Sequence, residues 1–185
     1  MSDLKPVSPL NGASTKGFAT VREIGPLGMI SLRAKPDVPG LAAAVKAVTG
    51  TDLPAPRRVI ENGERATGWM SPDEYLLVLP RADVPAALAG LVESLKGQHH
   101  LAVDVSDARA VFRIEGEKAD QALMKLLPVD FATLEPGELR RSRAAQVAAA
   151  VWKSGNGYTL VSFRSVAAYV FGALSHSVQP ASEPL

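Results

Sequence analysis

Runs in which apolar and polar residues alternate, or in which β-branched and aromatic residues cluster, recur along the chain and predict short β-strands. These runs occupy residues 19–24, 29–34, 58–61, 66–70, 75–79, 101–105, 110–115, 144–153 and 158–163. Turn residues separate several neighbouring runs: Gly25-Pro26-Leu27-Gly28 follows the first, and Asn62-Gly63 follows the third. We expect a hairpin at each of these places because such residues favour tight reversals of the chain.

A second set of segments carries apolar residues at helical spacing and predicts helices at 37–49, 83–95, 117–127 and 165–175. Asp37, Asp83 and Ser165 stand at three of the predicted starts, where a side chain that accepts hydrogen bonds from backbone amides is favoured. Gly50 and Pro128 stand just beyond two of the predicted ends.

The order of the predicted elements repeats in the two halves of the chain. Each half runs strand, strand, helix, then two or three strands, then a helix, and residues 74–81 resemble residues 157–164. Strands adjacent in sequence usually pair, and helices collect on one face of a sheet. We therefore expect two α+β units with antiparallel sheets and helices packed on one face. The expected divisions are an extended N-terminal arm (1–18), a first lobe (19–98), a second lobe (99–177) and a flexible tail (178–185).

Composition and charge narrow the range of functions. Lysine and arginine (20) nearly balance aspartate and glutamate (19), and the net charge of +1 offers no electrostatic footprint for nucleic acid. The absence of cysteine excludes disulfides, thiolate zinc ligands and a cysteine nucleophile. It also fits the reducing cytoplasm. No apolar run approaches the roughly 20 residues that span a bilayer, and the N-terminus is too polar for a signal peptide. We expect a cytoplasmic protein without membrane or nucleic-acid partners.

Candidates for catalysis or metal binding are few. His99 and His100 are neighbours on an extended segment, so their side chains point opposite ways and do not easily share one metal ion. Asp104 and Asp107 are explained by a turn, because aspartate side chains commonly accept hydrogen bonds from turn amides. No phosphate-binding glycine loop or nucleophile elbow occurs. The sequence therefore predicts no catalytic, cofactor-binding or metal-binding residue in this chain.

Two groups of residues are candidates for contact with another protein, because tryptophan and arginine are enriched among residues that anchor interfaces. The first group comprises Arg57, Arg58, Trp69, Met70 and Tyr75. The second comprises Arg141 and Arg143, in the densest basic segment of the chain. Core packing of the tryptophan and a solvated loop around the arginines are the alternative interpretations, and both stay open at this point.

Residues 104–131 carry a characteristic order of features. Asp-Val-Ser is followed by a short apolar and basic strand, then by Gly116, and then by a helical run that stops at Pro128. This order resembles the folate-binding aminomethyltransferase superfamily, which includes the glycine-cleavage T-protein. The resemblance implies two ferredoxin-like or T-protein-like α+β units.

Four segments, taken in order, narrow the resemblance: residues 68–76, 103–109, 126–130 and 141–147. They resemble the gamma-subunit family of heterotetrameric sarcosine oxidases. The resemblance implies assembly with alpha, beta and delta subunits, with alpha as the main contact. It implies oxidative demethylation of sarcosine to glycine with release of hydrogen peroxide, the one-carbon unit passing to tetrahydrofolate or leaving as formaldehyde. FAD, FMN, NAD and tetrahydrofolate would be bound by other subunits and none by this chain.

Residues 148–159 bear on whether the chain is catalytic. The resemblance implies an acidic residue on this strand pair in folate-binding transferases, whereas the stretch here contains no carboxylate. Alanine or valine cannot shuttle a proton or pair with an iminium ion. We therefore predict a non-catalytic subunit that stabilises the oxidase, and an isolated chain with an apolar patch larger than a few hundred Å². A free-standing folate-binding aminomethyltransferase-like protein and an unrelated small-molecule binding module are the alternatives.

Overall fold

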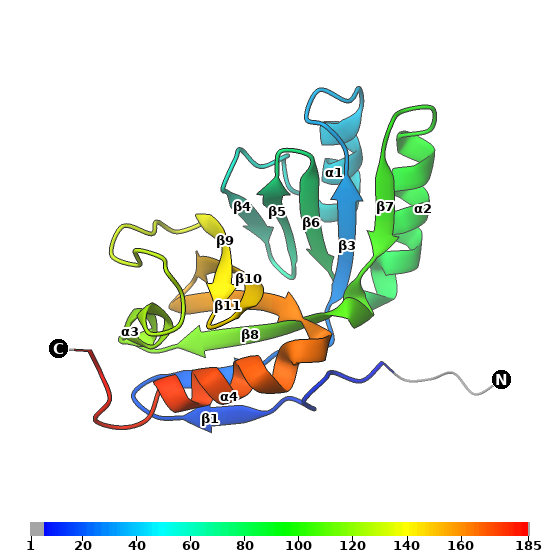
Figure 1. Ribbon diagram of the computed structural model, residues 1–185. Coiled ribbons are helices and arrows are strands. Elements are labelled where there is room, and N and C mark those ends of the chain that lie inside the picture. Colours follow the sequence, from blue (N-terminus) through cyan, green and yellow to red (C-terminus); the bar gives the residue numbers. More distant parts are fainter. Residues whose placement is uncertain (1–5, 185) are drawn as a thin grey trace. The chain divides into compact units, whose positions relative to one another are not determined.

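The computed structural model describes residues 6–184, and the chain forms two compact units. The six-stranded unit contains the residues up to Pro26, Asp107–Pro136, and the residues from Arg140 onward. The five-stranded unit contains Leu27–Ser106 and Gly137–Leu139. In the described part of the chain, each unit combines one sheet with two α-helices (Figure 1).

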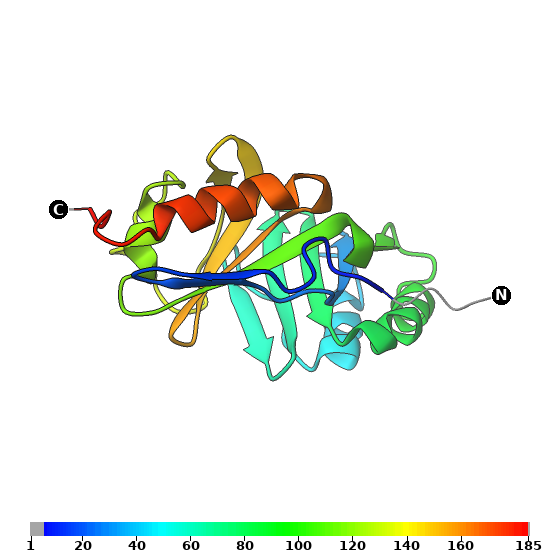
Figure 2. The ribbon, with the colours of Figure 1, turned by 90° about the horizontal axis from the view of Figure 1, so that it is seen from below.

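The sheet of the six-stranded unit has the strand order β1-β2-β8-β11-β10-β9. Its strands are β1 (Ser14–Lys16), β2 (Thr20–Glu23), β8 (Arg109–Glu115), β9 (Leu139–Ala144), β10 (Val147–Ser154) and β11 (Gly157–Phe163). Its helices are α3 (Ala119–Met124) and α4 (Ala167–Ser177), and the 3₁₀ turns η2 (Ser106–Ala108) and η3 (Arg164–Val166) precede β8 and α4. Figure 2 shows the β1–β2 hairpin running beside α4. A Cβ added to Gly17 in this hairpin would lie 1.6 Å from the Val178 carbonyl oxygen, so only glycine permits this approach.

The sheet of the five-stranded unit has the strand order β4-β5-β6-β3-β7. Its strands are β3 (Gly28–Arg33), β4 (Val59–Asn62), β5 (Arg65–Ser71), β6 (Glu74–Leu79) and β7 (Leu101–Asp104). Its helices are α1 (Leu41–Thr49) and α2 (Val84–Ser94), with the 3₁₀ turn η1 (Arg81–Asp83) before α2. The predicted stop at Gly50 is confirmed, because this residue caps α1 in the left-handed conformation with φ 71°.

Each unit has its own hydrophobic core between one face of the sheet and the helices, which confirms the predicted fold class. In the six-stranded unit, Phe112 of β8 belongs to a buried cluster with Leu123 of α3 and Leu174 of α4. In the five-stranded unit, Leu77 of β6 belongs to a cluster with Leu91 of α2. Burial of each such side chain contributes about 1.5–3 kcal/mol, and these clusters hold the helices against the sheets.

The strands that open the two sequence repeats are exchanged between the sheets. β2 precedes β3 in the chain but pairs with β8, and β7 precedes β8 but pairs with β3. The predicted hairpin of residues 19–24 with residues 29–34 is therefore wrong, because residues 25–28 carry the chain from one sheet into the other. The observed units differ from the predicted lobes, 19–98 and 99–177, for the same reason.

The register of the strands confirms the internal repeat. Tyr75 and Leu77 on β6 face Leu32 and Ile30 on β3. Tyr158 and Leu160 on β11 occupy the same positions opposite Ile114 and Phe112 on β8. The matching of residues 74–81 with residues 157–164 is thus a matching of equivalent strands.

Several elements differ from the sequence-based expectations. The helix predicted at 37–49 begins at Leu41, so Asp37 does not stand at its start. The predicted arm at 1–18 contains strand β1, which pairs with β2, so it is partly folded. The helix predicted at 117–127 is shorter, Ala119–Met124. The arginine-rich residues from Leu139 form the edge strand β9 instead of a loop. Residues 1–5 of the predicted arm and residue 185 of the predicted tail lie outside the described residues.

Candidate functional site

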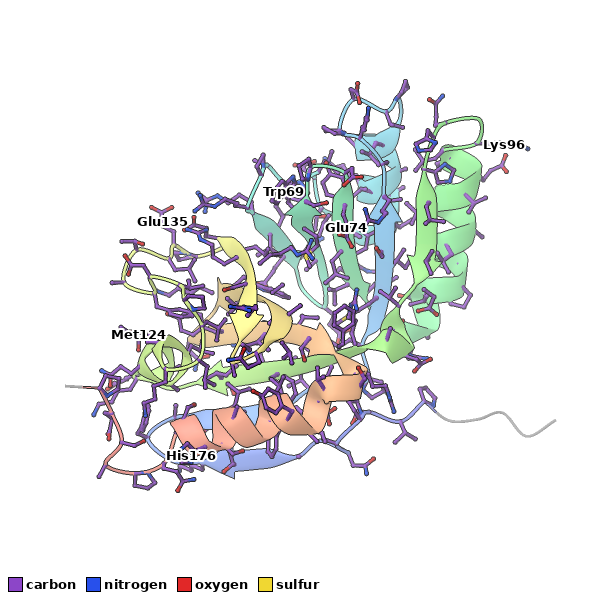
Figure 3. The ribbon with its side chains drawn as sticks, in the orientation of Figure 1. Trp69, Glu74, Lys96, Met124, Glu135 and His176 are labelled. Atoms are coloured by element: carbon purple, nitrogen blue, oxygen red, sulfur yellow. The ribbon has the colours of Figure 1, made fainter. Side chains whose placement is uncertain are left out.

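The candidate interface residues on β5 and β6 differ in how far their side chains are buried. Tyr75 is 1% exposed and belongs to the core of the five-stranded unit, and its burial raises the pKa of the phenol. A partner cannot reach this side chain, so Tyr75 is removed from the interface candidates. Trp69, labelled in Figure 3, is half-buried on β5 and packs against the same core. Met70 beside it is also half-buried.

Arg57 and Arg58 lie just before β4. The Arg57 guanidinium donates from Nη2 to Oε1 of Glu138 at 2.9 Å, and the Arg57 carbonyl oxygen accepts from the Leu139 amide at 2.8 Å. Arg58 forms an isolated antiparallel bridge with Glu138. The pair therefore fixes residues 137–139 to the five-stranded sheet. Arg57 keeps an exposed side chain, whereas Arg58 is half-buried.

Arg141 and Arg143 lie on β9, at the edge of the six-stranded sheet. Both are exposed, and because they are two residues apart they lie on the same face of the strand. Positive side chains on an edge strand discourage unspecific strand pairing. They also present a cationic surface to an acidic partner.

The strand pair β10–β11 occupies the stretch in which no carboxylate occurs. Ala149 and Val151 of β10 and Leu160 of β11 are buried in the core of the six-stranded unit. Trp152 is buried as well. The core-facing side chains Ala149, Val151 and Leu160 cannot act as a general acid or base, and neither strand carries a carboxylate.

A cleft of about 240 Å³ opens beside the β10–β11 turn. It is lined by Gly116, Glu117, Asp120, Lys153, Gly155, Asn156, Gly157 and Tyr158. Burial raises the pKa of the Tyr158 phenol, and the negative charge of Asp120 raises it further. A raised phenol pKa keeps Tyr158 neutral, because the neighbouring carboxylate disfavours a second negative charge.

Two other titratable residues named from the sequence, Asp104 and His100, have local hydrogen-bond partners. Asp104 accepts a hydrogen bond from the Ser106 amide at 2.9 Å, which confirms its turn-stabilising role. His100 lies 3.0 Å from the Gln98 carbonyl oxygen through Nδ1. In residues 6–184 no group of three or more His, Cys, Asp or Glu could hold a metal ion. The same residues contain no helix that is long and apolar enough to span a membrane.

Glu23 is a buried carboxylate that the sequence reasoning missed. It is 2% exposed at the end of β2. One of its oxygens, Oε2, accepts from Ser8 Oγ at 2.8 Å and from the Gly12 amide at 2.9 Å, and both oxygens lie 3.2 Å from the Leu10 amide. This N-terminal clamp fixes residues 8–12 onto the six-stranded unit. One signal could have revealed it: alternation places Glu23 on the same face as the buried Val21.

Comparison with known proteins extends these observations. Residues 33–180 match the family model described as "Sarcosine oxidase, gamma subunit family". The chain belongs to this family. Sarcosine oxidase subunit gamma of Corynebacterium sp. (strain U-96) is 33% identical over 143 residues, which cover 74% of this chain and 67% of that protein.

Two solved structures have folds similar to that of this chain. A chain of heterotetrameric sarcosine oxidase from Corynebacterium sp. U-96 matches with a TM-score of 0.82 and 25% identity, covering 94% of each chain. The glycine cleavage system aminomethyltransferase T from Bartonella henselae matches with a TM-score of 0.65 and 14% identity, covering 90% of this chain and 48% of that one. This second match confirms the predicted T-protein-like fold.

Proposed function

We propose that this chain is a non-catalytic gamma subunit that stabilises a heterotetrameric sarcosine oxidase, chiefly through contact with the alpha subunit. The observation that carries the proposal is the similarity to a chain of such an enzyme over 94% of both chains. Family membership over residues 33–180 supports it independently. Obligate subunit contacts of this kind commonly bury more than about 2,000 Å².

The chemistry is proposed to take place on the other subunits. There, sarcosine would be demethylated to glycine with FAD, FMN, NAD and tetrahydrofolate. The apolar packing of Ala149 and Val151 on β10 supports a structural role, because this strand carries no carboxylate that could act as the acid–base group of a folate-binding transferase. The predicted apolar patch of a few hundred Å² on the isolated chain stays a prediction.

Co-expression with the flavin-carrying subunits tests the proposal. A tag on this chain should recover the other three subunits in fixed ratio, with sarcosine-dependent formation of hydrogen peroxide. The three other subunits expressed without this chain should melt at a lower temperature, because a subunit that binds only the folded assembly stabilises it. Failure of the tagged chain to recover any partner would refute the assignment.

The isolated chain provides the second half of the test. We expect neither turnover of sarcosine nor a calorimetric signal on titration with tetrahydrofolate. Tight binding of tetrahydrofolate by this chain alone would favour the aminomethyltransferase-like alternative instead.

Arg141 and Arg143 on β9 are the proposed electrostatic part of the interface, together with Arg57 and Arg58. Trp69 and Met70 on β5 are its proposed apolar part. Reversal of two charges with Arg141→Glu and Arg143→Glu should slow assembly at low salt, because rim charges act mainly on the association rate. Lys96→Glu on the α2–β7 loop is the matched control, since it reverses an exposed charge elsewhere (Figure 3). Equal association rates for both variants would exclude β9 from the interface.

A further inference from the structure

A groove within the six-stranded unit is not used by the function described above. It has a volume of about 600 Å³ and is lined by Pro9, Asp107, Ala108, Phe163, Arg164 and Ser165. These residues come from the N-terminal segment, from η2 and from the corner between β11 and η3. Three separate parts of the chain therefore meet around one opening.

Phe163 gives the groove an exposed apolar surface. The Phe163 side chain is 47% exposed, and the Arg109 guanidinium carbon lies 4.4 Å from the centre of its ring. The two residues are directly opposite each other on β11 and β8. Stacking of a guanidinium on an aromatic face restrains both side chains, so the ring is presented in a fixed orientation.

The N-terminal clamp builds one wall of the groove. Glu23 holds Ser8 and Leu10, the residues on either side of Pro9. Proline restricts the backbone further through its fixed φ. The wall is thus restrained before any partner binds, and pre-organisation of this kind reduces the entropy lost on binding.

Helix α4, which follows the groove-lining residues in the chain, carries no permanently charged side chain and has His176 in its last turn. No Asp, Glu, Lys or Arg occurs from Ser165 to Ser177, a stretch that includes all of α4. Yet Ala168, Tyr169 and Gly172 on this helix are exposed. A surface helix normally carries charged side chains on its outer face. An uncharged outer face that continues from an aromatic groove indicates a surface that another protein covers.

We propose that this groove binds an extended segment of another subunit of the oxidase, with an apolar side chain against Phe163 and a carboxylate near Arg109 and Arg164. The partner's identity rests on the proposed function, whereas its chemistry follows from the lining. Arg164 lines the groove and Arg109 stacks on Phe163 beside it, whereas Asp107 is the one carboxylate among the lining residues, so an acidic group complements the groove better than a basic one. Aromatic residues and arginine are also the side chains most enriched at binding hot spots.

The test uses the co-purified oxidase and compares two exposed apolar residues of the same unit. Phe163→Glu should weaken binding of this chain to its partners by at least about 30-fold, because it removes the anchor and adds a repelling charge. Met124→Glu on α3 is the matched control, since Met124 is 51% exposed and lies outside the groove (Figure 3). Equal dissociation constants for the two variants would overturn the proposal.

A second measurement keeps the test decisive if the Phe163→Glu chain misfolds. Photo-activated p-benzoylphenylalanine in place of Phe163 should cross-link to a segment of another subunit within the assembled oxidase. A cross-link to a second copy of this chain, or no cross-link in a complete assembly, would overturn the groove proposal alone. Failure of the unmodified chain to assemble at all would instead refute the proposed function.

Discussion

The two units share one strand order but differ in how their sheets end beside the exchanged strands. In the six-stranded unit, β2 is covered by β1 through three residue pairs, and the N-terminal clamp lies beside it. In the five-stranded unit, the equivalent strand β7 is the edge of the sheet, and Leu101 on it is 55% exposed. Strand β2 is therefore paired on both of its edges, whereas the equivalent strand β7 is paired on one edge only.

The equivalent acidic residues at the ends of these strands show the same contrast. Glu23 on β2 pairs with Phe112, and Asp104 on β7 pairs with Ile30, at matching positions of the two sheets. Glu23 binds a distant segment of the chain, whereas Asp104 binds Ser106, only two residues away. Of these two equivalent residues, Glu23 therefore holds the N-terminal segment, whereas Asp104 stabilises a turn.

The largest loss of stability is expected from a substitution in β2, the strand that β1 covers. Val21→Asp should destabilise the chain by about 4 kcal/mol or more, because a carboxylate would enter a core position that is fully buried. Ala102→Asp is the matched control, since Ala102 occupies the equivalent position on β7 and is only half-buried. Urea denaturation compares the two variants. A loss of stability as large for Ala102→Asp would show that the two edges are equally important.

A smaller effect is expected from the N-terminal clamp. Glu23→Ala should cost about 1–3 kcal/mol, because it leaves the Ser8 hydroxyl and two amides without their acceptor. Hydrogen exchange should accelerate at Leu10 and Gly12 while the β8 amides stay protected. Asp104→Ala should leave exchange at these two amides unchanged. Unaltered protection in the Glu23→Ala chain would show that other contacts hold the segment.

The buried hydroxyls of the two units predict effects of opposite sign. Ser162 in the six-stranded unit is buried, and its Oγ has no hydrogen-bond partner within residues 6–184. Ser162→Ala should therefore stabilise the chain by about 1 kcal/mol. In the five-stranded unit, Thr67 Oγ1 lies 2.6 Å from Thr51 Oγ1 and donates to Thr49 Oγ1 at 3.2 Å. Thr67→Val should be destabilising by a similar amount, and thermal melts that move both variants the same way would contradict this contrast.

The smallest effect concerns pH. Tyr75 and Tyr158 have pKa values raised above 10.0 in the folded chain, chiefly by burial. The unfolded chain therefore loses these protons first, and stability that is complete below pH 10.0 falls as the pH rises beyond it. The urea midpoint should fall less steeply for Tyr158→Phe. Asp120→Asn should lower the pKa of Tyr158 but leave that of Tyr75 unchanged, as ultraviolet titration can measure.

Local patterns in the sequence identify most elements but not their pairing. Strand β6 and helix α2 follow from apolar periodicity, and the repeat follows from comparing residues 74–81 with residues 157–164. The exchange of β2 and β7 could not be predicted, because the turn signal at Gly25 is local whereas the pairing of β2 depends on β8, far away in the chain. Strand β9 was missed because its arginines hide any alternation.

For the candidate site too, the sequence predicts local features but not the contacts between distant segments. The family follows from motifs that survive in linear order, such as residues 68–76. Burial does not follow from those motifs. Tyr75 has an amphipathic side chain suited to an interface or a core, and only the packing of β6 against α1 and α2 decides between them. The surroundings of Glu23 and Phe163 are formed by segments that are distant in the chain and meet in space.

The exchange of strands also imposes an order on biosynthesis. While the polypeptide leaves the ribosome, β2 emerges before β3 and can pair only with β1 until β8 has been translated. The nascent N-terminal half can assemble β3 to β6 with α1 and α2, yet it must wait for β7 to finish that sheet. Newly made chains therefore carry a β1–β2 hairpin with one unpaired edge until β8 is made, and a chaperone that shields extended segments would find its substrate there.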